Sequence, residues 1–195
     1  MFSYATFFCI LVTVMAEFGR RDPNKYAENE RHFSLQRLSE MTNISNTIYV
    51  LMRDYNLNTS YDCLSAKKLR VYNTTLYEYN LTARFNHRTF HSYKVNITAK
   101  ITGTHKEPND AYYEEVKGEG PTDHKLMTMN SKRTCFVFAV KLKNSSRYGC
   151  MLAATEDVAD ARYPPWHCDL VYRRNCGPQS IILYKEDCKK AIAKR

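Results

Sequence analysis

The alternation of apolar and polar residues in two neighbouring segments constrains the fold of this chain most. In residues 75–85 the odd positions include Tyr77, Tyr79 and Phe85, whereas most even positions are polar. Residues 91–101 repeat the pattern, with Tyr93 and Val95 at odd positions. A period of two is typical of strands with one buried and one solvated face. We therefore predict two antiparallel strands, joined by a hairpin loop over residues 86–89.

Further segments rich in β-forming residues extend this sheet. We predict strands at 47–55, 61–72, 111–116, 125–129, 134–142, 148–155 and 180–184. Helices are expected near both ends, namely one short amphipathic helix through 33–41, two at 156–162 and 165–175, and a basic C-terminal helix or tail. About eight antiparallel strands in hairpin order predict an all-β, eight-stranded up-and-down barrel that encloses one small ligand. A β-sandwich is the alternative, although it would leave the terminal helices less expected.

The first 16 residues form an uncharged, apolar leader. It ends in Val14-Met15-Ala16, the small-x-small pattern at which signal peptidase cleaves. The leader is too short to span a bilayer, which takes about 20 apolar residues. We predict a signal peptide over 1–16, a single domain over 17–195, and a secreted, extracellular protein without a membrane anchor.

Loss of the leader removes Cys9 and leaves an even number of cysteines. The six that remain are Cys63, Cys135, Cys150, Cys168, Cys176 and Cys188. In an exported chain of this size they predict three disulfides, for which the sequence alone allows fifteen pairings. No cysteines or histidines are spaced as in a zinc finger, so we expect neither a metal nor a cofactor.

Six Asn-x-Ser/Thr sequons point to a glycan coat and a eukaryotic secretory route. They begin at Asn43, Asn58, Asn73, Asn80, Asn96 and Asn144. Asn80 and Asn96 both fall on the polar face of the alternating segments, where a bulky glycan has to lie. The glycan and strand predictions therefore agree.

The net charge of +9 is spread along the chain rather than gathered in one basic block. We therefore expect no nucleic-acid partner. The charge favours either anionic partners or simply a solvated basic surface. The sequence contains no nucleophile elbow and no Gly-rich phosphate loop, so we do not expect an enzyme.

Several short motifs, taken in order, resemble the tick salivary lipocalins, the tick histamine-binding family. They are Tyr49-Val50-Leu51, Cys63-Leu64-Ser65-Ala66, Cys135-Phe136-Val137, Tyr148-Gly149-Cys150, Pro165-Trp166-His167-Cys168, Cys176-Gly177-Pro178 and Tyr184-Lys185-Glu186-Asp187-Cys188. The resemblance covers nearly all of the mature chain. It implies a small secreted barrel that sequesters host inflammatory mediators in evasion of host defence, and the pairings Cys63–Cys188, Cys135–Cys168 and Cys150–Cys176.

The amine-binding members of that family carry a signature from which this chain departs. In them an acidic residue follows one strand cysteine, and a Glu-Leu-aromatic triplet lies on the next strand. Here Phe136 occupies the acidic position, and Met151, Leu152 and Ala153 occupy the triplet. Asp54 stands where the family often places a pocket acid, although it also fits a surface charge. We therefore expect an apolar or anionic lipid mediator rather than a histamine-type biogenic amine.

The ligand pocket is predicted from the inward positions of the strands. Its residues are Asp54, Tyr77, Tyr79, Phe85, Tyr93, Phe136, Phe138 and Met151. The expected partner is a small hydrophobic or amine ligand from the host, and the protein is expected to be a monomer. The alternative function is an immune or complement modulator that binds a host protein through loops on a lipocalin scaffold.

Overall fold

The computed structural model describes residues 22–161 and 163–193. The predicted signal peptide and the first mature residues lie outside this part of the chain. The strands are β1 Ile48–Arg53, β2 Tyr61–Val71, β3 Leu76–Phe85, β4 Thr89–Lys100, β5 Asp110–Tyr113, β6 Thr122–Met129, β7 Cys135–Lys141, β8 Tyr148–Thr155 and β9 Ile181–Ile182. The helices are α2 Pro23–Ala27, the 3-10 helix η2 Glu30–Leu35, α3 Leu38–Thr42, α4 Trp166–Asn175 and α5 Cys188–Ala193.

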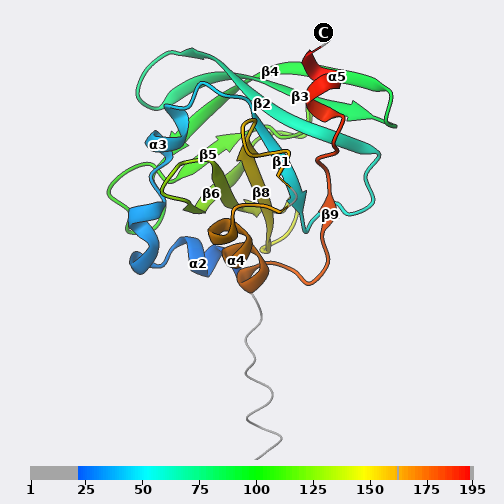
Figure 1. Cartoon of the computed structure of the whole chain (residues 1–195). Helices are drawn as coiled ribbons and strands as arrows, with labels where there is room; N and C mark the ends of the chain where they lie inside the picture. The colour runs from blue at the N-terminus through cyan, green and yellow to red at the C-terminus, as the bar shows by residue number, and fades with distance from the viewer. Residues whose placement is uncertain (1–21, 162, 194–195) are drawn as a thin grey trace, which may run out of the picture.

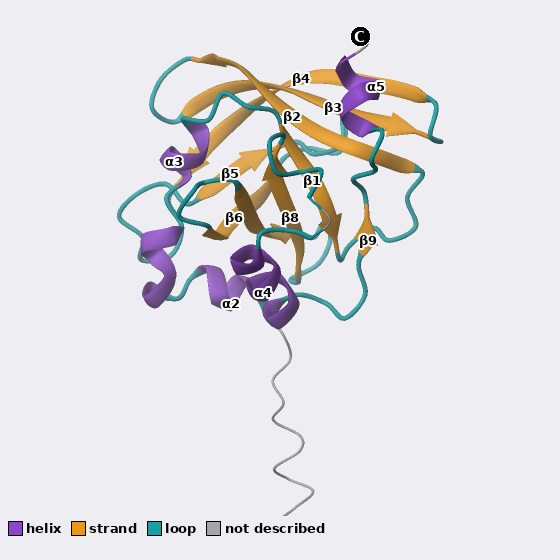
Figure 2. Cartoon of the chain, in the orientation of Figure 1, coloured by secondary structure: helices purple, strands orange, loops and turns teal. Residues whose placement is uncertain are grey.

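Strands β1 to β8 form a closed antiparallel barrel (Figures 1 and 2). Each strand pairs with the next from β2 to β8, β8 pairs with β1, and β1 returns to β2. The predicted 86–89 hairpin is present as a turn between β3 and β4, which pair in continuous register from Leu76↔Thr98 to Phe85↔Thr89. The eight-stranded up-and-down barrel predicted from the sequence is therefore confirmed.

The seam between β1 and β2 is completed by the C-terminal segment. Only the first residues of β1 pair with β2, at Ile48↔Ala66 and Tyr49↔Ser65. Further along, β1 pairs with β9, and the Leu183 carbonyl accepts a hydrogen bond from the Cys63 N–H at 2.9 Å. The Cys63–Cys188 disulfide holds this segment against β2.

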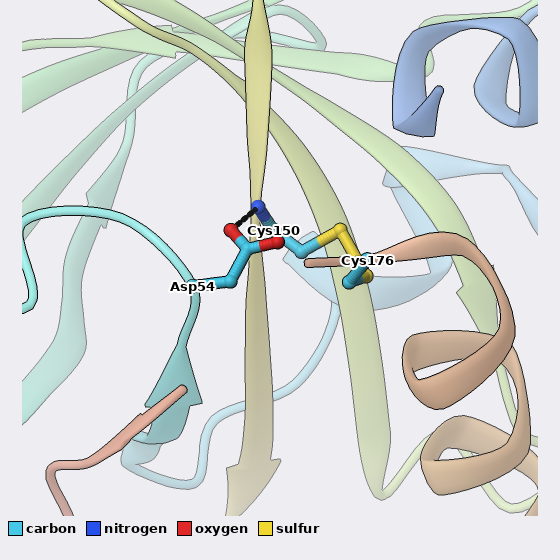
Figure 3. A group of neighbouring side chains, drawn as sticks. All are labelled: Asp54, Cys150 and Cys176. Carbon is cyan, nitrogen blue, oxygen red and sulfur yellow. Dashed lines mark hydrogen bonds between the residues drawn. A yellow bond between two sulfur atoms is a disulfide. The ribbon is translucent and has the colours of Figure 1, made fainter. Parts of the chain in front are cut away.

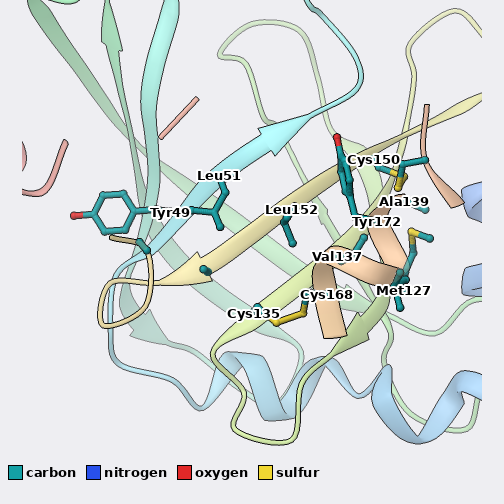
Figure 4. Close-up of a cluster of buried hydrophobic side chains, with 14 of the residues drawn as sticks. Tyr49, Leu51, Met127, Cys135, Val137, Ala139, Cys150, Leu152, Cys168 and Tyr172 are labelled. Atoms are coloured by element: carbon teal, nitrogen blue, oxygen red, sulfur yellow. A yellow bond between two sulfur atoms is a disulfide. The ribbon is translucent and has the colours of Figure 1, made fainter. Parts of the chain in front are cut away.

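The alternation of the strands separates two hydrophobic clusters. On β7, Phe136 and Phe138 belong to the cluster inside the barrel, whereas Val137 and Ala139 belong to a second cluster outside it. The outer cluster (Figure 4) is covered by α2 and α4, both of which pack against β6, β7 and β8. The inner cluster is closed at one end of the barrel by Leu38 of α3.

The N-terminal helices differ from the prediction. The apolar spacing through 33–41 predicts one amphipathic helix, but η2 ends at Leu35 and α3 begins at Leu38. The break lies at Gln36, whose buried side-chain amide donates a hydrogen bond to the Met127 carbonyl at 2.9 Å. The predicted helix at 156–162 is also wrong over its described residues, because 156–161 form turns. Helix α4 is confirmed.

Three disulfides join the described cysteines, in the pairs that the family resemblance implies: Cys63–Cys188, Cys135–Cys168 and Cys150–Cys176. The second and third attach α4 to β7 and β8. Because α4 covers the outer cluster, these bonds hold that cluster closed.

Candidate functional site

A cavity of about 830 Å³ opens at the end of the barrel opposite α3. Its walls come from the β1–β2 loop, the β5–β6 loop and the β7–β8 hairpin, with Gly177 and Pro178 from the segment after α4. The apolar lining residues include Leu57, Val116, Val140, Leu142 and Pro178. A cavity of this size lies within the range of pockets that hold small organic ligands, about 300–1,000 Å³.

A buried ion pair borders the cavity through Glu115, which belongs to its lining. Arg53 Nη1 donates to Glu115 Oε1 at 3.0 Å, and the Tyr55 hydroxyl donates to the same carboxylate at 3.1 Å. The Arg53 side chain is only 6% exposed and that of Glu115 is 18% exposed. Burial by itself would raise the pKa of Glu115, but the hydrogen bonds and charges of His124, Arg53 and Tyr55 lower this pKa overall. Glu115 is therefore ionised, and its negative charge is already compensated by Arg53.

Aromatic rings surround this ion pair. His124 stacks on Tyr113 with ring centroids 4.0 Å apart, and its Nε2 atom lies 3.8 Å from Glu115 Oε2. The Tyr93 hydroxyl donates to the backbone carbonyls of Glu114 and Glu115. Burial is the main cause that raises the pKa of Tyr93 to about 12 and the pKa values of Tyr55 and Tyr113 well above their usual range. All three hydroxyls therefore stay protonated at neutral pH.

Three cations lie at the rim of the cavity, and one of them has a carboxylate partner. Lys143 pairs with Glu119 at 3.0 Å, which ties the β7–β8 hairpin to the β5–β6 loop. Arg147 forms no ion pair with any described residue, and Lys141 lies over the Tyr148 ring at 4.8 Å. Two positive charges therefore remain available to a ligand at the rim.

Asp54 lies at the edge of the cavity, and its carboxylate is hydrogen-bonded to the backbone (Figure 3). Its carboxylate accepts hydrogen bonds from the N–H groups of Cys150 and Gly177, both at 2.5 Å. A Cβ atom at position 149 would lie 2.9 Å from Asp54 Oδ1, so the glycine there leaves room for this contact. Burial raises the pKa of Asp54, and the backbone hydrogen bonds oppose that rise. Asp54 thus holds the 176–178 segment against β8.

Most of the aromatic residues predicted to line the pocket lie deeper in the barrel. Tyr77, Tyr79, Phe136, Phe138 and Met151 are buried members of the inner cluster, and Tyr93 packs against it. None of the six lines the cavity at the barrel end. Phe85 lies outside both clusters, with its ring 5.1 Å from that of Tyr61. Of the eight predicted residues, only Asp54 borders this cavity.

The ion pair of Arg53 and Glu115 was not predicted from the sequence. Arg53 and Glu115 stand beside two other charged residues, Asp54 and Glu114, and nothing in the local pattern distinguishes the members of the ion pair from their charged neighbours. The one signal in the sequence is that His124 and Leu126 are two residues apart on β6 and so face the same side of the sheet. This spacing places the His124 imidazole on an apolar, inward-facing side.

The described residues form two groups of cysteine and acidic side chains close enough to suggest a metal site. One contains Asp54 with Cys150 and Cys176, and the other contains Asp187 with Cys63 and Cys188. In both groups the sulfur atoms are joined in disulfides. A disulfide offers no thiolate, so neither group has the donor set of a metal centre.

No protein-family model matches the sequence, and no curated protein matches it. Solved structures do match the fold. Japanin from Rhipicephalus appendiculatus, bound to cholesterol, matches with a TM-score of 0.51 and 15% identity over 71% of this chain and 91% of that chain. Lobster apocrustacyanin A1 matches with a TM-score of 0.54 and 8% identity over 85% and 87%. The siderocalin Ex-FABP, described as having dual ligand specificities, matches with a TM-score of 0.51 and 10% identity over 72% and 93%.

The chain therefore has the lipocalin fold, a closed eight-stranded barrel with few flanking helices. An eight-stranded barrel of this kind is wide enough to hold one small ligand, as in lipocalins. One of the matches is a tick protein, in keeping with the resemblance noted in the sequence. In the described part of the chain, no helix is long and apolar enough to cross a membrane.

Proposed function

We propose that this protein is a secreted lipocalin of the tick salivary type, which sequesters a small anionic amphiphile such as a lipid mediator of the host. In this proposal the apolar body of the ligand lies between Leu57, Val116 and Leu142, and its acidic group lies at the rim. Secretion is supported by the three disulfides, which persist in oxidising compartments. Japanin, a tick protein with a similar fold, binds cholesterol, which supports a lipid as the ligand class.

The distribution of charge at the cavity carries this proposal. Each carboxylate that lines it already has a donor: backbone N–H groups for Asp54, Arg53 for Glu115 and Lys143 for Glu119. An amine would have to compete with these donors for its counter-charge. An acid would meet Arg147 and Lys141, neither of which has a carboxylate partner in the described structure.

Calorimetric titration tests the ligand class with arachidonate, cholesterol, histamine and serotonin. Arachidonate is expected to bind with a micromolar or lower Kd, whereas the amines give no measurable heat. Trp166 is 74% exposed at the start of α4, at the other end of that helix from the cavity, so its fluorescence is a poor reporter. Tighter binding of an amine than of arachidonate would overturn the choice of an acidic ligand.

Two charge-reversal variants test whether the acidic group of the ligand binds at the rim. Arg147→Glu is expected to weaken arachidonate binding at least tenfold because it replaces the rim cation with an anion. Arg31→Glu makes the same change on the exposed face of η2, near the closed end, and is expected to leave the Kd within twofold. Equal effects of the two variants would show that net charge alone, and not the rim, determines binding.

A second candidate function is the binding of a host protein. The observation that favours it is the exposure of Tyr163 and Trp166, at 67% and 74%, beside the start of α4. Exposed aromatic residues are enriched at protein interfaces. If no small ligand binds, capture of a plasma protein that depends on Trp166 would support this alternative, and Trp166→Ser would then abolish the capture.

A further inference from the structure

The β7–β8 turn places the Asn144 sequon at the cavity mouth. Its neighbours on both sides, Lys143 and Ser145, line the cavity, while Asn144 itself is exposed. The turn is closed by a hydrogen bond from the Leu142 N–H to the Arg147 carbonyl at 3.1 Å. A group attached to Asn144 would therefore stand directly beside the opening.

Asn144 is well suited to modification. Its side chain makes no hydrogen bond with the described residues, whereas Asn73 accepts hydrogen bonds from Thr75 and the half-buried Asn80 donates to Thr82. Its φ angle of +51° lies in the left-handed region, which asparagine tolerates better than most residues. The tight, exposed turn thus presents a free amide at the tip of the hairpin.

The attachment point is also held in place. Lys143 binds Glu119 through both the backbone carbonyl and the carboxylate, the latter at 3.0 Å, so the hairpin is fastened to the loop on its other side. A second sequon lies in the β1–β2 loop at Asn58, which is exposed and follows the lining residue Leu57. Two of the three loops that form the mouth therefore carry a sequon.

We propose that an N-linked glycan on Asn144 covers part of the cavity mouth and controls the passage of ligands. This inference rests on the proposed function, because it assumes that the cavity holds a small ligand. The glycan is bulky and hydrated, so it narrows the approach without contacting the bound ligand. It slows entry and exit by the same factor and leaves the affinity for a ligand that fits unchanged. The glycan on Asn58 narrows the same opening from the β1–β2 loop.

The test uses a matched pair of serine substitutions in protein secreted from eukaryotic cells. Ser146→Ala removes the Asn144 sequon and keeps the asparagine in its left-handed conformation. Ser45→Ala removes the Asn43 sequon at the closed end of the barrel. Both serines are exposed, and neither side chain makes a hydrogen bond within the described structure. Mass spectrometry establishes which sites carry glycans. Stopped-flow mixing with a fluorescent fatty acid gives the association rate constant, and its displacement by excess arachidonate gives the dissociation rate constant.

For Ser146→Ala we expect the association and dissociation rate constants each to rise at least threefold, with the Kd within twofold of the wild type. Ser45→Ala should leave both rates unchanged. Wild-type protein that carries no glycan on Asn144, or equal rates in the wild type and Ser146→Ala, would overturn the inference while leaving the proposed function intact. Failure of arachidonate to bind any of the three proteins would instead overturn the proposed function, and this inference with it.

Discussion

At the scale of single residues, the ion pair of Arg53 and Glu115 joins the end of β1 to the β5–β6 loop. Replacing Glu115 by leucine would leave Arg53 charged, buried and without a carboxylate. Breaking a buried pair in this way costs about 3–5 kcal/mol. We therefore expect Glu115→Leu to lower the free energy of unfolding by about 3 kcal/mol in denaturant titrations. The double variant Arg53→Met/Glu115→Leu should recover most of that loss, and equal destabilisation by both variants would contradict this account.

The inward positions of the barrel strands could be predicted from the sequence, whereas the cavity at the barrel end could not. Tyr77, Tyr79 and Phe136 were predicted to face inward, and they do lie in the inner cluster. The sequence gives no measure of how completely such side chains fill the space, and here the cavity lies closer to the barrel end. Loops form that end, and loop residues such as Leu57 and Val116 follow no period that reveals their partners.

At the scale of elements, the C-terminal segment acts as part of the barrel wall. Residues 181–183 fill the seam beside β1, and Arg84 on β3 binds Asp187 just before α5. The Cys63–Cys188 disulfide closes a loop of 125 residues, for which the chain-entropy model gives about 4–5 kcal/mol. We expect Cys63→Ala/Cys188→Ala to lower stability by several kcal/mol and to speed hydrogen exchange at the Leu183 N–H, which binds the Leu51 carbonyl. Unchanged exchange at Leu183 would show that β9 pairing alone holds the seam.

The prediction of elements succeeded where one face of a strand is buried. From β1 to β8 the alternation or β-forming content marked every strand, because side-chain period follows directly from strand geometry. The prediction failed at 33–41, where apolar residues with the spacing of one helix belong to two short helices. A tertiary contact, from Gln36 to the Met127 carbonyl, separates them, and no local pattern encodes a partner 91 residues away.

At the scale of the whole molecule, stability should depend on pH through carboxyl groups that are shifted in opposite directions. Although burial opposes it, Arg84 and His87 lower the pKa of Asp62, and Lys125 and Thr102 lower that of Glu28. Groups with a lowered pKa contribute stability above the usual carboxyl range, about pH 4, and lose it as the pH falls. Acid should therefore destabilise the fold.

Asp110 has the opposite effect. It is fully buried, neither carboxylate oxygen has a hydrogen-bond partner among the described residues, and burial together with the nearby Asp123 raises its pKa to about 7. Between about pH 4 and pH 7 the folded chain holds a proton that the unfolded chain has lost, so stability falls as the pH rises through this range.

The substitution Asp110→Asn is expected to remove this pH dependence of stability. Thermal unfolding should show a midpoint at least about 2 °C above the wild type at pH 8, with a smaller difference or none at pH 5. A constant difference between the two proteins across this range would show that Asp110 titrates normally, and the decline of the wild type would then have another origin.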